Sequence, residues 1–253
     1  MTETKDLSIE EDGEIGIVRL DRQAKRNAIS QAMIAEIGQL FAAPPEHWKA
    51  AILCGAGPHF SAGLDLREHG TRSVDAVMDL SRLWHRTTEA MLNGRLPIVA
   101  ALNGYVIGGG LELAAATHIR IADRSVRYSL PEGRRGIFVG GGASVRVGRM
   151  IGTSRLTELM LTGREVDAEE GQQIGLSHRL VEPERAFETA LEVARTVAAN
   201  APQSNRMILH GLAQIGEMPP SAGLFAESVM VALTQADPEA QERLDAFLTK
   251  RTR

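Results

Sequence analysis

Apolar positions along the chain follow two different periods. In the segment 7–20 they alternate around an Asp12-Gly13 pair, which predicts a β-hairpin closed by that turn. From Met33 to Phe41 and from Val74 to Leu92 they recur every three or four residues, which predicts two helices, and Ser30 is placed to cap the first. Further strands are predicted at 51–54, 98–102, 119–122 and 127–129. This interleaving is typical of an α/β fold built from repeated supersecondary units.

Beyond about residue 183 the pattern is helical. Four segments each begin with a proline, a residue suited to the first turn of a helix: 183–199, 202–212, 219–233 and 238–250. Apolar residues in this region, such as Leu224 and Phe225, predict that it packs back on the core or against another subunit. We therefore divide the chain into a core, 1–200, and a C-terminal helical region, 201–253.

Composition narrows the class of protein. A chain of 253 residues can bury a substantial core, and its net charge of −4 gives no support for a nucleic-acid or membrane-surface partner. The one cysteine, Cys54, lies in an apolar run, so we expect a buried thiol and no intrachain disulfide. The first residues resemble neither a secretory signal nor a transit peptide, and no apolar run approaches the ~20 residues that span a bilayer. We expect a cytoplasmic protein.

Three glycine clusters, at 55–57, 108–110 and 140–142, raise the question of nucleotide binding. None has glycines at the first, third and sixth positions of a dinucleotide fingerprint, and none continues into the Lys-Ser/Thr pair of a P-loop. The stretch 59–63 lacks the first glycine of a serine hydrolase elbow. The histidines show no zinc-ligand spacing, so we expect no metal site.

Two of the glycine-rich turns predict exposed backbone N–H groups. The segment 60–66 follows a strand and a Gly-Pro turn, and Gly108-Gly109-Gly110 leads into a helix that opens at about Leu111. Unpaired N–H groups at such turns can bind an anion, and two that converge can stabilise an oxyanion. When each glycine cluster is taken alone, close backbone packing or a positive φ explains it better than anion binding does.

Two glutamates follow these turns. Glu112 falls in the first turn of the predicted helix, and Glu132 comes 20 residues later at the end of a predicted strand, both among apolar neighbours. Burial would raise the pKa of both carboxyls toward neutrality and suit them to proton transfer, while the helix N-terminus opposes this for Glu112. Position alone explains Glu112 as a partner of the helix dipole.

Taken together and in order, these motifs resemble the crotonase, or enoyl-CoA hydratase/isomerase, superfamily over nearly the whole chain. The matching segments are 20–28, 55–66, 103–114, 161–164, 175–176 and 247–251. The resemblance implies a spiral of ββα units, followed by a C-terminal helical region that drives formation of a trimer, often as a dimer of trimers.

The resemblance also implies roles for individual residues. The oxyanion hole would consist of the N–H groups of Leu64 and Gly109. Coenzyme A would be bound by Lys25, Arg26 and Ala62, together with Phe247 and Lys250 of a neighbouring subunit. The acyl pocket would be lined by Phe138 and Val139, with His69, Trp84 and Phe225 as further candidates for which core packing is an equal explanation. Val139 stands where many relatives have proline, so the substrate preference does not carry over.

Having glutamate at both catalytic positions favours a hydratase. By resemblance, Glu112 would orient and deprotonate water, and Glu132 would protonate the α-carbon of a 2-enoyl-CoA. Coenzyme A would be part of the substrate, and neither a metal nor a redox cofactor is expected. Isomerisation, thioester hydrolysis and hydration coupled to carbon–carbon cleavage are alternatives on the same scaffold. A non-catalytic scaffold is a further alternative, against which the retention of both glutamates and both donor loops argues.

Overall fold

The computed structural model describes residues 6–69 and 73–251. They fall into two compact units, Met1–Arg195 and Thr196–Arg253. The first contains every strand of the described chain and the glycine-rich turns; the second is helical.

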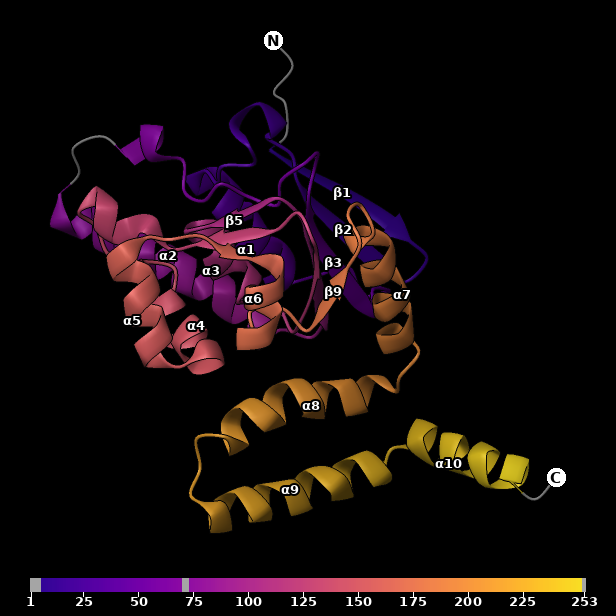
Figure 1. Ribbon diagram of the computed structural model, residues 1–253. Coiled ribbons are helices and arrows are strands. Elements are labelled where there is room, and N and C mark those ends of the chain that lie inside the picture. Colours follow the sequence, from indigo (N-terminus) through magenta and orange to yellow (C-terminus); the bar gives the residue numbers. More distant parts are fainter. Residues whose placement is uncertain (1–5, 70–72, 252–253) are drawn as a thin grey trace. The chain divides into compact units, whose positions relative to one another are not determined.

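A six-stranded sheet forms the centre of the first unit (Figure 1). It begins with an antiparallel hairpin of β1 (Leu7–Asp12) and β2 (Ile15–Leu20), whose turn contains Gly13 at a φ of 62°. Parallel strands extend the sheet from β2 in the order β3 (Ala50–Gly55), β4 (Ile98–Leu102), β6 (Ile119–Asp123) and β9 (Arg179–Val181). β3 and β4 are almost entirely buried, as apolar runs in a parallel sheet should be.

A smaller sheet of three strands contains β5 (Tyr105–Ile107), β7 (Arg127–Ser129) and β8 (Val166–Asp167). β5 leads directly into the second glycine turn, and β7 leads toward Glu132. Because β5 and β7 are parallel neighbours, with Ile107 opposite Ser129, their carboxyl ends deliver both segments to the same place.

Helices pack around these sheets. α1 (Gln31–Ala42) begins at the N-cap Ser30 and α2 (Val74–Leu92) has the predicted bounds, so both predictions are confirmed. α7 (Ala186–Ala198) lies on the other side of the large sheet from α1 and α3 in Figure 1. The remaining helices of the unit are α3 (Gly109–Ala114), α4 (Ala143–Ile151), α5 (Thr153–Thr162) and α6 (Ala168–Ile174).

The second unit contains α8 (Pro202–Ile215), α9 (Pro220–Gln235) and α10 (Pro238–Arg251). The predicted α/β class with C-terminal helices is confirmed. One helix starts later than predicted: α7 begins at Ala186, because Glu182 to Arg185 form a turn in which Glu184 has a φ of 67°. Within the described residues, no helix is long and apolar enough to cross a membrane.

Candidate active site

The first glycine-rich loop is fixed by bonds to two distant segments. Ser61 pairs with Val106 of β5, and its hydroxyl donates to Asn27 O at 2.7 Å and accepts from Gly63 N at 3.1 Å. Gly63 has a φ of 92°, a conformation open to glycine, and Asp65 N donates to Ile29 O. The N–H of Leu64 lies between these anchors and donates to no group in the described parts of the chain.

The second loop turns from β5 into α3. Gly108 has a φ of 53° and donates its N–H to Ser129 O, which leaves the next amide, that of Gly109, at the open N-terminus of the helix. The two loops lie close together, because a Cβ atom on Gly109 would lie 3.3 Å from Leu64 N and one on Gly63 would lie 3.3 Å from Gly109 N. The amides of Leu64 and Gly109 are therefore neighbours, with glycine keeping the space between them free.

Glu112 follows in the first turn of α3 with 5% of its surface exposed. Its Oε1 accepts hydrogen bonds from Gly141 N at 2.7 Å and Ala143 N at 3.1 Å, in the turn before α4. Burial raises the pKa of this carboxyl, while the two amides and the nearby guanidinium of Arg146 oppose the rise. Glu112 is thus a buried acid whose ionised form is stabilised by two amide hydrogen bonds to one of its oxygens.

Glu132 lies in a short 3-10 helix, Pro131–Arg135, and is 6% exposed. Its Oε2 is buried and has no hydrogen-bond partner in the described structure. Burial raises the pKa of Glu132, and its own backbone N–H opposes part of this rise. The charge of Glu112 raises the pKa further, and Arg135 lowers it slightly. With no donor on this oxygen, the ionised form of Glu132 has less hydrogen-bond support than that of Glu112.

Both glutamates and both loops line one small cavity of about 50 Å³. The predicted residues that line it are Leu64, Gly109, Glu112, Glu132, Phe138 and Val139. The structure thus brings together residues that are far apart in the sequence. The cavity can hold one small chemical group, with hydrogen-bond donors and two buried carboxyls around it.

The remaining predicted residues fall into four sets. Trp84 lines a larger neighbouring cavity of about 300 Å³. Lys25, Arg26 and Ala62 lie beside the first loop, since Ala62 N donates to Arg26 O and the ammonium of Lys25 pairs with Asp65 at 2.9 Å. Phe225 and Phe247 belong to the second unit and are exposed. The side chains of His69 and Lys250 lie outside the described structure.

Sequence reasoning did not identify the groups that hold Glu112. They are the amides of Gly141 and Ala143 and the side chain of Arg146, which donates to Gly141 O. The glycine cluster at 140–142 was the available signal: Gly142 has a φ of 104°, and a Cβ atom on Gly141 would lie 2.8 Å from Glu112 Oε2. These glycines let the turn approach the carboxylate.

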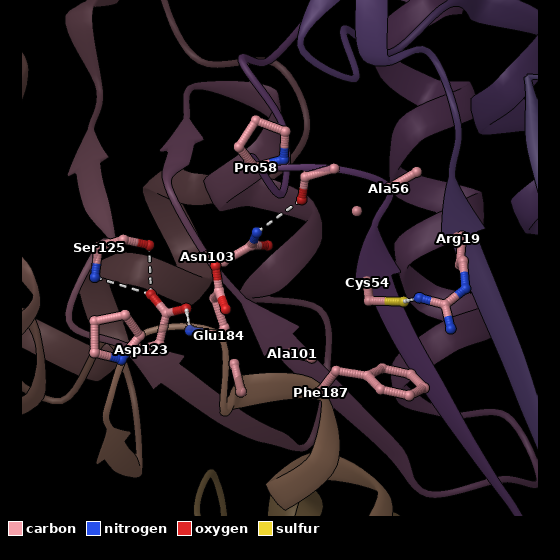
Figure 2. Close-up of a pocket in the computed structure, with 14 residues that line it drawn as sticks. Arg19, Cys54, Ala56, Pro58, Ala101, Asn103, Asp123, Ser125, Glu184 and Phe187 are labelled. Carbon is pink, nitrogen blue, oxygen red and sulfur yellow. Dashed lines mark hydrogen bonds between the residues drawn. The ribbon is translucent and has the colours of Figure 1, made fainter.

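A third cavity, of about 710 Å³, opens near the carboxyl ends of β3, β4 and β6 (Figure 2). Asp123 accepts hydrogen bonds there from Ser125 N and Glu184 N, and the guanidinium of Arg19 lies 4.4 Å over the ring of Phe187. None of the predicted catalytic residues lines this cavity. Among the described side chains, no group of three or more His, Cys, Asp or Glu could hold a metal ion.

Comparison with known proteins places this site in a family. Residues 10–253 match the family described as enoyl-CoA hydratase/isomerase. The 2,3-dehydroadipyl-CoA hydratase of Escherichia coli is 31% identical over 93% of this chain and 92% of its own length. The mevalonyl-coenzyme A hydratase of Aspergillus fumigatus is 34% identical over 93% of this chain and 88% of its own length.

Solved structures of similar proteins indicate the same family. A crystal structure from Rhodopseudomonas palustris is 44% identical, with a TM-score of 0.95 over 98% of this chain and 96% of that one. The enoyl-CoA hydratase of Bacillus anthracis is 29% identical, with a TM-score of 0.92 over 97% of both chains. The chain therefore belongs to the enoyl-CoA hydratase/isomerase family, the crotonase superfamily, and the prediction of an enzyme of this type is confirmed.

Proposed function

We propose that this enzyme hydrates the double bond of a 2-enoyl-CoA to give a 3-hydroxyacyl-CoA. The observation that carries the proposal is the single cavity lined by two buried glutamates and two loops with neighbouring free amides. A conjugated thioester accepts water at its β-carbon only when the negative charge that develops on the carbonyl oxygen is stabilised. The N–H groups of Leu64 and Gly109 would provide that stabilisation.

The surroundings of the two carboxyls support different roles. Glu112, with two amide donors and Arg146 close by, would be the ionised base that takes a proton from water as its oxygen bonds to the β-carbon. Glu132, buried and unpartnered at Oε2, would be the protonated acid that gives a proton to the α-carbon. A return of one proton from Glu112 to Glu132 through solvent closes the cycle, with no metal or redox cofactor in any step.

Lys25, Arg26 and Ala62 would bind the coenzyme A part of the substrate beside the first loop. Phe247 and Lys250 of a neighbouring copy would reach the nucleotide, which requires a homo-oligomer, a trimer or a dimer of trimers. The apolar residues exposed on α9 support such an assembly, because surfaces of this kind are usually covered.

The test is hydration of crotonyl-CoA and longer 2-enoyl-CoA esters by the wild type, Glu112→Gln and Glu132→Gln. Each variant should lose about 10²–10⁴-fold in kcat, the usual contribution of a general acid or base. Glu188→Gln, at an exposed position on α7, is the matched control. Mass spectrometry of the products separates hydration from isomerisation, thioester hydrolysis and carbon–carbon cleavage. Near-normal hydration by either variant would remove that glutamate from its role.

A further inference from the structure

The small reaction cavity continues into the larger cavity of about 300 Å³, here called the apolar chamber. Six residues line both: Leu64, Leu66, Glu112, Ile137, Phe138 and Gly140. A substrate whose reacting carbons lie between the glutamates would therefore extend its acyl tail into the apolar chamber.

One wall of the chamber is a stripe of α2. Val77, Leu80, Ser81 and Trp84 lie at helical spacing along it, on one face of the helix. Leu80 and Trp84 are buried, whereas Val77 is 51% exposed, so this part of the stripe faces open space. The only hydroxyl on this wall is already used, because Ser81 Oγ donates to Gly140 O at 2.7 Å.

The opposite wall comes from the turn after Glu132. Ile137 and Phe138 are 47% and 70% exposed, and Gly140 and Gly141 contribute backbone and no side chain. A Cβ atom on Gly141 would lie 2.7 Å from the Trp84 ring, so glycine lets the turn pack closely against α2 at this end of the chamber. An apolar tail between the two walls would cover apolar side chains that water otherwise contacts, which favours binding.

The charge of the chamber lining favours an uncharged acyl tail over one that ends in a carboxylate. Of the described residues that line the chamber, Glu112 alone is charged. A carboxylate at the end of an acyl tail would lie near a like charge and would exchange its water shell for apolar walls, which is unfavourable on both counts. The relative from Escherichia coli is a hydratase of 2,3-dehydroadipyl-CoA, an ester with such a carboxylate.

We propose that the enzyme prefers 2-enoyl-CoA esters with an uncharged, apolar acyl chain of about eight to twelve carbons. A group the size of a water molecule takes up about 30 Å³, so the chamber of about 300 Å³ has room for about ten such groups and can hold the roughly five to nine carbons that such a chain has beyond C3. This inference rests on the proposed hydration. It assigns the tail to the space between α2 and the turn 137–141.

The first experiment compares kcat/KM of the wild type for four esters: crotonyl-CoA, 2-hexenoyl-CoA, 2-decenoyl-CoA and 2,3-dehydroadipyl-CoA. Each methylene buried should contribute about fourfold, so 2-decenoyl-CoA should exceed crotonyl-CoA by at least ~30-fold. The six-carbon pair isolates charge, and 2-hexenoyl-CoA should exceed 2,3-dehydroadipyl-CoA by at least ~10-fold. Equal or inverted values in either comparison would overturn the proposal.

The second experiment narrows the chamber. Val77→Trp should lower kcat/KM for 2-decenoyl-CoA by ~10-fold or more and leave crotonyl-CoA within about twofold. Val74→Trp, one turn earlier on α2 and outside the chamber lining, is the matched control and should change neither. Equal losses for both substrates in Val77→Trp, or the same result in Val74→Trp, would contradict the assigned position of the tail.

A binding measurement separates this inference from the proposed function. Titration calorimetry with decanoyl-CoA and butanoyl-CoA, which cannot be hydrated, should show at least ~10-fold tighter binding of the longer ester. If that preference is found but no 2-enoyl-CoA is hydrated, the proposed reaction is wrong and the tail assignment stands. If hydration is found but butanoyl-CoA binds as tightly as decanoyl-CoA, the reaction stands and the tail assignment is wrong.

Discussion

Glu112 and Glu132 place the same functional group in two different surroundings. Both are almost completely buried, but Glu112 accepts two amide hydrogen bonds on Oε1, whereas Glu132 Oε2 has no partner in the described structure. Leaving a buried polar atom unpaired costs stability, and such costs concentrate at functional sites. The position of Glu132 is therefore better explained by its use in a reaction than by its contribution to folding.

This cost predicts a pH-dependent gain in stability for Glu132→Gln. Burial and the charge of Glu112 raise the pKa of Glu132 above its unfolded value of 4.5, with Arg135 opposing. The folded state therefore holds the proton more tightly, and wild-type stability is lost as the pH rises through the raised pKa. We expect the variant to be more stable at pH 8 by about 1 kcal/mol, a Tm about 2–4 °C higher, and the gain to shrink toward pH 4.5.

Thermal unfolding of the two proteins between pH 4.5 and pH 9 checks this prediction. Glu188→Gln controls for the loss of one carboxylate at an exposed position. A gain in Tm that is constant across the pH range, or a wild type that is the more stable protein at pH 8, would show that Glu132 is not under strain.

The absence of a side chain at Gly109 leads to a second prediction, about the oxyanion position. A Cβ atom there would lie 3.3 Å from Leu64 N and 3.0 Å from the Trp84 ring, in the space proposed for the thioester oxygen. Gly109→Ala keeps the N–H but fills this space, so we expect it to lower kcat by about 10²–10³-fold, as much as the loss of one oxyanion donor. Gly148→Ala on α4, where a Cβ atom would first meet Leu156 at 3.4 Å, is the control in steady-state kinetics. An unchanged kcat in Gly109→Ala would exclude the proposed oxyanion position.

At the scale of elements, Ser30 shows how a single side chain sets a helix start. Its Oγ accepts from Met33 N at 3.1 Å and donates to Asp6 at 3.0 Å, so it caps α1 and ties the helix to the chain before β1. Ser30→Ala should lower the free energy of unfolding by about 1 kcal/mol, whereas Ser30→Thr should retain most of it. Denaturant titration measures both, and equal midpoints for Ser30→Ala and the wild type would contradict this role.

Local patterns explain which elements the sequence predicted. α1, α2, β3 and β4 are long or uniformly apolar, so periodicity alone located them. α4, α5 and α6 were not predicted, because they are short and are separated by glycines, among them Gly152 and Gly163, that mimic loops.

The site was predictable only in part, for a related reason. The loops and glutamates were placed by their resemblance to a family, but the bonds from Gly141 and Ala143 to Glu112 span about thirty residues and leave no local pattern. The apolar period of α2 also did not show that Val77 lines a cavity, because a helical stripe shows which residues share a face and not what covers that face.

At the scale of the whole molecule, α9 exposes apolar side chains in the described structure. They include Leu224, Phe225, Val229, Val231 and Leu233. We expect the chain to form a trimer or a multiple of it in solution, and the double variant Leu224→Glu, Phe225→Glu to give a smaller species, because charges at a buried interface are unfavourable.

Light scattering after size-exclusion chromatography measures the mass of each species. Ser221→Glu, in the exposed first turn of α9, where a negative charge suits the helix dipole, is the control. A monomeric wild type would contradict the assembly, and with it the supply of Phe247 and Lys250 by a neighbouring copy.

The cavity in Figure 2 also bears on how the enzyme can be assayed. Cys54 contributes to its wall, yet it is 3% exposed, and burial raises the pKa of its thiol to about 11. At pH 8 only about one such thiol in a thousand is a thiolate, the form that attacks disulfide reagents. A chromogenic disulfide can therefore test for thioester hydrolysis, the alternative reaction that would release free coenzyme A, because the folded protein contributes almost no background colour.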